Sequence, residues 1–360
     1  MIDKNQRECL LSLIRLGIGN NHAVSFPSNH INWRAIESIA EKQGLSAIVL
    51  DGIEQLPETV RPPKEDLLQW IGCTLQIYEY RYELYRQAIS EIASFYNSHG
   101  FKMMVLKGFS CSLTWPKPAH RPCGDIDIWL FGKQKEADLA LLRELNIKID
   151  SSHHHHTVFF WKSFMVENHY DFINVYHHKS NAELEGILKK LGMVDNNKVQ
   201  LLGETIYLPS PMLHTIFLLR HASGHFATSE ISLRMLLDWA FHIKYYSREI
   251  DWKSIISTIE EFGMKPIFAI FNAICIEDLG FEATLFPNME YDKVLKERVL
   301  MDIIIPEFSG IEPQCVVSRV LFKIRRWNAN GWKHALCYKE NRLSSFLSAT
   351  WNHILKPSSI

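Results

Sequence analysis

The stretch Met104–Leu130, MVLKGFSCSLTWPKPAHRPCGDIDIWL, decides how the fold of this chain is interpreted. Near its start, an apolar run is interrupted by Lys107-Gly108. Near its end, Asp125 and Asp127 alternate with apolar residues. Side chains two residues apart on a strand point to the same face, so the alternation predicts a strand with both acids on one side.

Two carboxylates on one face of an otherwise apolar strand repel each other and lose hydration. Such a pair is stabilised by a cation, and hard oxygen ligands suit Mg²⁺ or Mn²⁺. The competing interpretation is a solvated edge strand that carries Asp125 and Asp127 by chance. The pair alone does not decide between the two.

The composition is that of an ordinary globular protein. The 360 residues are 47% hydrophobic and 22% charged, which argues against disorder and leaves room for two or three domains. The formal net charge of −1 gives no overall field that would attract nucleic acid or an anionic membrane. A local basic patch stays compatible with these numbers.

The seven cysteines are scattered and include no Cys-x-x-Cys pair. This usage is typical of reduced thiols in a cytosolic protein and not of a disulfide framework or a zinc site. The first residues do not resemble a signal peptide, and no apolar run approaches the roughly 18 residues of a membrane span. We therefore expect a cytoplasmic protein without a membrane partner.

Hydrophobic periodicity divides the chain into three parts. Residues 1–99 are predicted to be a helical region, 100–209 an α+β core and 210–360 a helical domain. Within the core we expect strands and a hairpin at 101–106, 125–131, 157–161, 165–172 and 204–208, with 173–178 extending the sheet. This order favours an α+β fold in which a small mixed sheet is flanked by helices on both sides.

The Lys-Gly turn follows a predicted strand and precedes a short predicted helix. Gly108 permits close approach of a ligand to the backbone, and the following helix start presents free N–H groups. Ser110 adds a hydroxyl and Lys107 a positive charge, so the unit is suited to a triphosphate. An ordinary strand-to-helix turn has the same appearance in sequence.

A phosphate site beside a metal-binding acid pair is the minimum equipment for nucleotidyl transfer. A third carboxylate on a neighbouring strand usually completes such a site. Glu167 is the best candidate, and His169 shares its strand face. The alternative is that Glu167 is a surface acid in a hairpin.

Together these residues resemble an uncharacterised bacterial nucleotidyltransferase family of the polymerase β-like superfamily. The resemblance covers roughly residues 100–280, and its most specific part is the Arg-Pro-x-Gly-Asp-x-Asp string. The five segments that carry it, in order, are Leu106-Lys107-Gly108, Arg121–Asp127, Val166–His169, His221–His225 and Leu233–Asp238.

The resemblance implies a small mixed sheet, a metal pair on Asp125 and Asp127, Glu167 as third acid, and phosphate contacts from Gly108 and Ser110. Two departures from the family pattern stand out. Phe109 follows Gly108 where the superfamily often has Ser or Gly, which would narrow the phosphate site. Asn168 replaces a usual apolar residue before His169.

His221 and His225 are four residues apart and lie on one helix face. We consider three roles: polar packing against Arg234 or Asp238, lining of the nucleotide cleft, and binding of a metal, the last being poorly supported without His-Glu-x-x-His. Arg121 either neutralises phosphate charge or is a solvated loop residue.

Two further segments leave alternatives open. The run His153, His154, His155 and His156 either approaches the cleft or forms a solvated loop, which we favour. The basic, aromatic segment from Lys323 to Lys339 suits either a nucleic-acid backbone or an amphipathic helix with snorkelling cations, and we favour the helix.

We expect a Mg²⁺- or Mn²⁺-dependent transferase that moves a nucleoside monophosphate from an NTP such as ATP to an acceptor hydroxyl and releases pyrophosphate. The acceptor, whether a small molecule, a protein or tRNA, the base preference and the oligomeric state are not encoded in any recognisable pattern. The rival hypotheses are an inactive nucleotide-binding or interaction protein of the same fold and a toxin-type transferase that acts on tRNA or protein.

Overall fold

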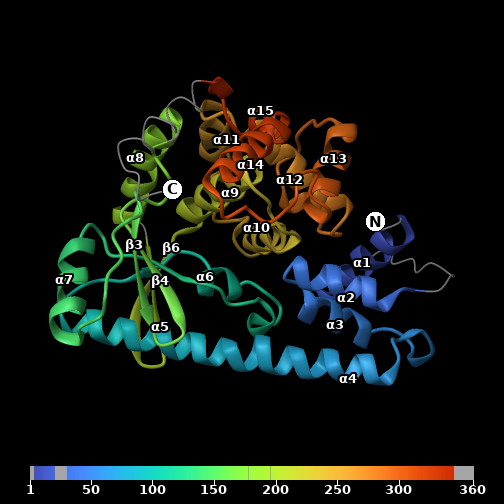
Figure 1. Cartoon of the computed structure of the whole chain (residues 1–360), viewed down its shortest axis with the longest axis horizontal. Coiled ribbons are helices and arrows are strands. Elements are labelled where there is room, and N and C mark those ends of the chain that lie inside the picture. Colours follow the sequence, from blue (N-terminus) through green and yellow to red (C-terminus); the bar gives the residue numbers. More distant parts are fainter. Residues whose placement is uncertain (1–3, 21–30, 177, 195, 344–360) are drawn as a thin grey trace.

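The computed structural model describes residues 4–20, 31–176, 178–194 and 196–343. In this part of the chain, one mixed sheet of six strands is flanked by helices before and after it in sequence (Figure 1). The predicted α+β class is therefore confirmed.

The sheet has the strand order β3-β4-β2-β1-β6-β5. Parallel pairing joins β2 to β4 and β1 to β6, whereas β1–β2, β3–β4 and β5–β6 are antiparallel. The strands are β1 (Met104–Val105), β2 (Ile126–Trp129), β3 (His156–Trp161), β4 (Phe164–His169), β5 (Asn196–Leu201) and β6 (Glu204–Pro209). Asp127 of the acid motif thus lies on β2, in the interior of the sheet, and Asp125 immediately precedes that strand.

Before the sheet, three short helices lead into one long helical rod. The short helices are α1 (Lys4–Gly17), α2 (Trp33–Lys42) and α3 (Ser46–Glu54), followed by the 3₁₀ turn η1 (Glu58–Val60). The rod consists of α4 (Lys64–Cys73), the π-helical turn η2 (Thr74–Tyr80) and α5 (Arg81–Ser98). Figure 1 shows the rod running beneath both the N-terminal helices and the sheet.

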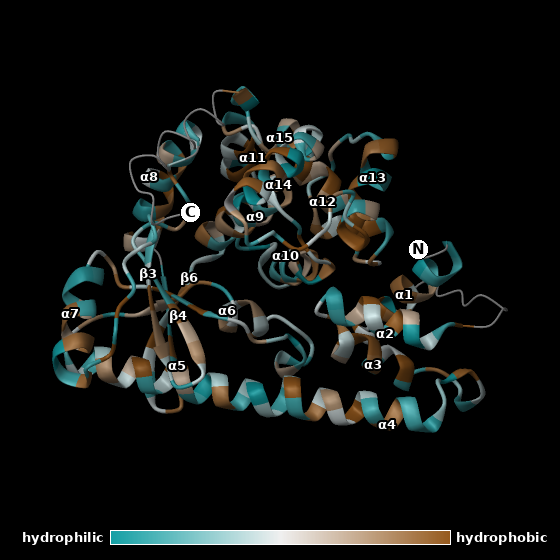
Figure 2. Cartoon of the chain, in the orientation of Figure 1, coloured by the Kyte–Doolittle hydropathy of each residue, from teal (hydrophilic) through white to brown (hydrophobic). Residues whose placement is uncertain are grey.

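Polar and apolar residues are interspersed along this rod, as expected of a helix that packs on one side and is exposed on the other (Figure 2).

Asn32 caps α2 by accepting a hydrogen bond from the Ala35 amide at 3.1 Å, as its position before that helix predicts.

The remaining helices connect or follow the strands. Those of the core are α6 (Phe109–Ser112), η3 (Pro118–His120), α7 (Gln134–Leu145) and α8 (Lys179–Val194). Those after the sheet are α9 (Pro211–Thr228), α10 (Leu233–Tyr246), α11 (Trp252–Glu261), α12 (Lys265–Glu277), η4 (Ala283–Leu285), α13 (Lys293–Ile304), α14 (Val316–Ala329) and α15 (Gly331–Cys337).

The described residues form two hydrophobic clusters. One lies between α5 and the sheet and contains Tyr85, Phe109, Ile126 and Ile128. The other joins residues of α1–α3 to residues of the helices that follow the sheet. The domain boundaries near residues 99 and 209 stay a prediction, and apolar packing crosses the regions that they define.

Two local predictions differ from the structure. Residues 173–176 and 178 form no strand, so they do not extend the sheet. Strand β5 was not predicted because Asn196-Asn197-Lys198 is polar; the strand lies at the edge of the sheet, where polar side chains face water.

In the part of the chain that the structure describes, none of the helices combines the length and the apolar character needed to cross a membrane. All seven cysteines are described, and each is a free thiol.

Candidate functional site

Asp127 and Glu167 are direct neighbours on two paired strands. The parallel register of β2 and β4 aligns Asp127 with Glu167 and Trp129 with His169. One ligand atom each from Asp127, Glu167 and His169 lie within 4.8 Å of one another. The hairpin acid that the sequence proposed as a third carboxylate is thus placed beside the second acid of the pair.

Two cations lie against Asp127, which is almost completely buried. Lys107 Nζ is 2.8 Å and His169 Nε2 is 2.9 Å from the same oxygen, Asp127 Oδ1. His169 Nε2 also lies 3.3 Å from Glu167 Oε2. Burial alone would raise the pKa of Asp127, but Lys107 and His169 outweigh it and hold that pKa well below its usual range.

The pKa values of the two partners of Asp127 shift in the opposite direction, upward. Burial would lower the pKa of His169, but its hydrogen bonds to Asp127 and Glu167 raise it to about 9. The Lys107 ammonium is also buried, yet the charges of Asp127 and Asp125 raise its pKa. The site therefore balances its carboxylates with the cationic side chains of Lys107 and His169.

Asp125 immediately precedes β2 and is only partly buried. Its carboxylate lies outside the group of converging atoms formed by Asp127, Glu167 and His169. Burial, and then repulsion by Asp127, raises the pKa of Asp125. The two acids of the motif thus occupy different electrostatic environments although only Ile126 separates them in sequence.

The Gly108 turn places its backbone against the long helix. Its φ of +65° is in the left-handed region, and a Cβ at this position would lie 2.3 Å from Tyr85 Oη. That hydroxyl donates a 2.8 Å hydrogen bond to the backbone carbonyl of Asp125. A glycine is therefore required for the strand that carries the acids to remain anchored to α5.

The next two residues, Phe109 and Ser110, do not contribute to the cavities at the site. Phe109 belongs to the core between α5 and the sheet and stacks on Tyr82 with ring centroids 6.5 Å apart. Ser110 donates its hydroxyl hydrogen bond to the Leu106 carbonyl at 2.7 Å. Among the described residues, neither lines the two cavities at the site. Phe109 therefore does not narrow the cleft, and the Ser110 hydroxyl is already engaged.

Two cavities of about 550 and 470 Å³ meet at the acids, and both are lined by Lys107, Asp125, His221 and His225. The larger cavity also contains Gly108 and Asp127, and the smaller one Glu167 and His169. These volumes are within the range of small-molecule sites. The two cavities are therefore neighbours that share a wall beside the acids.

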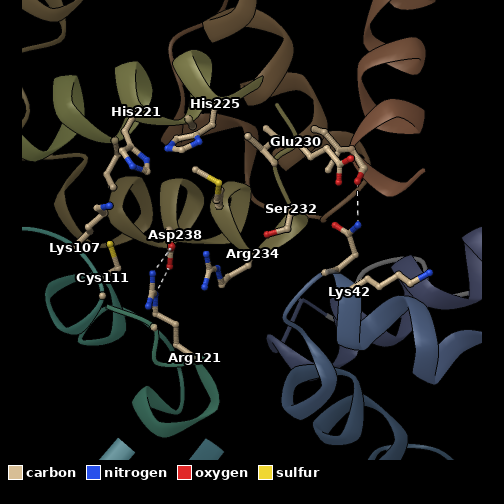
Figure 3. A pocket seen from close by; sticks show the side chains of 18 of the residues that line it. Lys42, Lys107, Cys111, Arg121, His221, His225, Glu230, Ser232, Arg234 and Asp238 are labelled. Carbon is tan, nitrogen blue, oxygen red and sulfur yellow. Dashed lines mark hydrogen bonds and ion pairs between the residues drawn. The ribbon is translucent and has the colours of Figure 1, made fainter. Parts of the chain in front are cut away.

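The larger cavity is assembled from segments far apart in the sequence. Figure 3 shows α2, α9, α10 and the loop of Lys107 to Arg121 converging on it. Gln43 links two of these segments: its Nε2 donates to the Ile303 carbonyl at 2.9 Å, and its Oε1 accepts from the Leu233 amide at 2.7 Å. Lys42 and residues 303, 304 and 306 complete the wall.

Arg121 and Asp238 form a buried bidentate ion pair with N–O distances of 2.8 and 2.9 Å. Trp115 Nε1 donates to the same carboxylate at 2.9 Å. The pair joins the loop before β2 to helix α10, and both residues also line the larger cavity. Arg121 is therefore not a solvated loop residue, and its charge is balanced by Asp238.

Arg234 lies beside this pair, as Figure 3 shows, and also lines the larger cavity. Its Nε is buried and has no hydrogen-bond partner among the described residues. Burial, and then repulsion by Arg121, lowers the pKa of Arg234. A guanidinium with this unused donor at a cavity wall is suited to an anionic ligand.

His221 and His225 project from α9 into both cavities, with ring centroids 4.5 Å apart (Figure 3). Asp238, which we considered as their partner, instead binds Arg121 and Trp115. Loss of hydration lowers the pKa of the partly buried His221 and of the more exposed His225, which favours neutral imidazoles. The structure thus places them in the cleft.

A family model described as an uncharacterised nucleotidyltransferase matches residues 29–277 of the chain. The match includes Gly108, Asp125, Asp127, Glu167 and Arg234. The chain belongs to this nucleotidyltransferase family. Comparison with curated proteins and with solved structures gave no match. The resemblance inferred from the five motifs is therefore confirmed.

The last two residues of the histidine run, His155 and His156, are not part of a solvated loop. His156 begins β3 and is buried, and together with His155 it lines the smaller cavity beside Glu167 and His169. The favoured interpretation of a solvated loop is thus wrong for these two residues. The reason is the register of the hairpin, which pairs His156 directly with His169.

Several residues that line the larger cavity carry no signal in the sequence. Lys42 and Gln43 end a helix, and Ile303 and Ile304 end another, more than 250 positions later. Their place at the site depends on tertiary packing alone. Tyr85, whose hydroxyl donates to the Asp125 carbonyl, likewise carries no sequence signal that places it at the site.

The donor set of the acid group fits a divalent cation. Two carboxylates supply hard oxygen ligands, and His169 supplies a nitrogen that Mn²⁺ accepts more readily than Mg²⁺. Lys107 and His169 now balance the negative charge that such an ion would neutralise. Asp125 flanks the group from the cavity wall.

Proposed function

We propose that the protein transfers a nucleoside monophosphate from an NTP to an acceptor hydroxyl, and that Asp125, Asp127 and Glu167 hold the divalent metal. The observation that carries the proposal is the register of β2 and β4, which sets the Asp127 and Glu167 carboxylates side by side next to the Gly108 turn. Membership of a nucleotidyltransferase family supports it.

The larger cavity is the site that we assign to the triphosphate. The unpartnered Nε of Arg234 is a donor suited to phosphate oxygens, and Gly108 permits their close approach to the backbone. His221 and His225 supply neutral imidazoles to the same space, and Lys107 supplies charge. Arg121 supports this wall through its ion pair with Asp238.

In the proposed reaction, the acceptor oxygen forms a bond to the α-phosphorus of the NTP. The bond between that phosphorus and the oxygen bridging to the β-phosphate breaks, and pyrophosphate leaves with the electron pair. Glu167 accepts the hydroxyl proton of the acceptor, which enters from the smaller cavity. When bound, the metal neutralises charge on the phosphate oxygens.

We assign Mg²⁺ or Mn²⁺ as the ion and the cytoplasm as the location, where seven free cysteines persist as thiols. The test is incubation with labelled NTPs and Mg²⁺, with candidate acceptors from small-molecule, protein and tRNA fractions. The wild type is expected to label one class, and Asp127→Ala to label none. Equal turnover in the two proteins would contradict the assignment.

A second function deserves a test because Lys107 and His169 already neutralise Asp127 and Glu167. This arrangement also suits a protein that binds nucleotide without transferring it. Titration calorimetry separates the two: nucleotide binding without product from any acceptor supports the binding protein, whereas multiple turnovers exclude it.

A further inference from the structure

Three histidines converge beside the acids, on the wall of the smaller cavity. One ring nitrogen each from His155, His156 and His169 lie within 4.8 Å of one another. Their ring centroids are 4.4 Å apart for His155–His156, 5.4 Å for His156–His169 and 5.9 Å for His155–His169. The rings therefore surround one small volume.

The backbone fixes this arrangement. His156 and His169 are register partners on the antiparallel strands β3 and β4, so their side chains are cross-strand neighbours. The carbonyl of His155 accepts hydrogen bonds from the amides of Tyr170 at 2.8 Å and Asp171 at 3.3 Å. Those two bonds hold the residue before β3 against the end of β4.

The cluster contains a donor atom without a partner. His156 is only 7% exposed, and its Nδ1 has no hydrogen-bond partner among the described residues. A buried imidazole nitrogen in that state costs free energy unless a ligand satisfies it. The smaller cavity, lined by all three histidines, is the space from which such a ligand reaches them.

Imidazole nitrogens prefer Zn²⁺, Co²⁺ and related transition-metal ions over Mg²⁺. Three protein nitrogens leave a fourth position of a tetrahedral ion for water or a substrate oxygen. We propose that His155, His156 and His169 bind one divalent transition-metal ion at a site that adjoins the acid group and shares His169 with it, so that the ion displaces the proton now held between His169, Asp127 and Glu167. This proposal goes beyond nucleotidyl transfer and does not depend on it.

The experiment is a titration of the chelator-treated full-length protein, prepared without an affinity tag, with Co²⁺. Binding is followed by the visible ligand-field absorption of the ion. We expect one Co²⁺ per chain, displaced by Zn²⁺ and retained in excess Mg²⁺. Absence of the absorption band, or its loss on addition of Mg²⁺, would overturn the proposal.

Substitutions assign the ligands. His155→Ala, which changes a partly exposed side chain, is expected to weaken Co²⁺ binding about 10- to 100-fold. His156→Ala should act in the same direction, with circular dichroism confirming that it folds. His154→Ala is the matched control from the same run, because it lies outside the converging group, and should bind Co²⁺ as the wild type does.

The acid group is tested in parallel. Asp127→Asn is expected to keep the Co²⁺ band while nucleotidyl transfer is lost, so failure of the transfer proposal and failure of the histidine proposal give different results. A band that disappears in Asp127→Asn and persists in His155→Ala would place the ion on the carboxylates and overturn the histidine site.

Discussion

At the level of single residues, the charges around Asp127 distinguish it from Asp125. Asp127 shares one carboxylate oxygen between Lys107 and His169, whereas Asp125 faces a cavity and the repulsion of its neighbour. The two acids are chemically identical and two positions apart, yet their pKa values shift in opposite directions. Substitution of each should therefore affect stability differently.

We predict that Asp127→Asn lowers the free energy of unfolding by about 3 kcal/mol, because it leaves buried Lys107 without its main counter-charge. Asp125→Asn should change stability by less than about 1 kcal/mol, because it removes a repelled carboxylate. Both should reduce transfer at least about 100-fold. Urea denaturation and initial rates provide the measurements, and equal stability losses would contradict the assignment of charges.

Gly108→Ala tests the anchor between the turn and α5. The new Cβ would meet Tyr85 Oη at a φ that disfavours alanine, so we expect a loss of about 2–4 kcal/mol in unfolding free energy. Tyr85→Phe removes the obstructing oxygen. In a double-mutant cycle, part of the cost of Gly108→Ala should vanish when Tyr85 is also replaced by Phe. If the stability losses of the two substitutions are strictly additive, the contact between the new Cβ and Tyr85 Oη does not cause the loss.

At the level of secondary structure, His120 connects three elements through hydrogen bonds. Its Nδ1 lies 2.7 Å from Asp51 of α3 and its Nε2 3.0 Å from Glu79 of η2. His120 itself ends the short helix η3 in the loop before the acid strand. Burial opposes protonation, but hydrogen bonds to Asp51 and Glu79 outweigh it and raise the pKa of His120.

A group whose pKa is raised by folding stabilises the protein in its protonated form. This contribution is complete below the usual pKa of 6.5 and is lost as the pH rises through the raised value. We predict that His120→Asn costs about 2 kcal/mol at pH 6 and progressively less at higher pH. Urea denaturation at several pH values measures the difference.

His99→Asn is the comparison for that series, because His99 also faces a carboxylate, Glu144, but its side chain is more exposed than that of His120. Its substitution should cost less at pH 6 than that of His120, because solvent screens the more exposed pair. A pH-independent cost of His120→Asn would mean that the residue contributes through packing and not through its charge.

The sequence predicted the elements that have a strong period and missed those without one. The alternation at Asp125 and Asp127 predicted β2, and the spacing of Glu167 and His169 predicted their shared face. Nothing local distinguishes Asn196–Leu201 from a polar loop, because edge pairing with β6 creates that strand. Likewise, only pairing across the hairpin brings His156 to His169.

At the scale of the whole molecule, the larger cavity depends on segments at both ends of the chain. Gln43 follows α2, yet it bonds to Ile303 at the end of α13 and to Leu233 at the start of α10. The family match ends at residue 277, so part of this wall lies outside the matched region. Such long-range contacts leave no local pattern from which the cavity is predictable.

We predict that Gln43→Ala lowers the free energy of unfolding by about 1–3 kcal/mol, since it leaves a buried amide and a buried carbonyl unpaired. Because Gln43 lines the cavity away from the acids, KM for the NTP should rise several-fold while kcat changes little. Steady-state kinetics over a range of NTP concentrations tests this. A selective loss of kcat would contradict the assignment of this wall to nucleotide binding.

The acids on β2 and β4 are proposed to serve transfer of a nucleotidyl group. Parallel reactions with α-labelled and γ-labelled NTP test this proposal most directly. In the presence of Mg²⁺ and a competent acceptor, we predict that the α-label becomes attached to the acceptor and the γ-label appears in pyrophosphate. Both events should be absent in Asp127→Asn. Attachment of the γ-label to the acceptor, or equal labelling by Asp127→Asn, would contradict the claim.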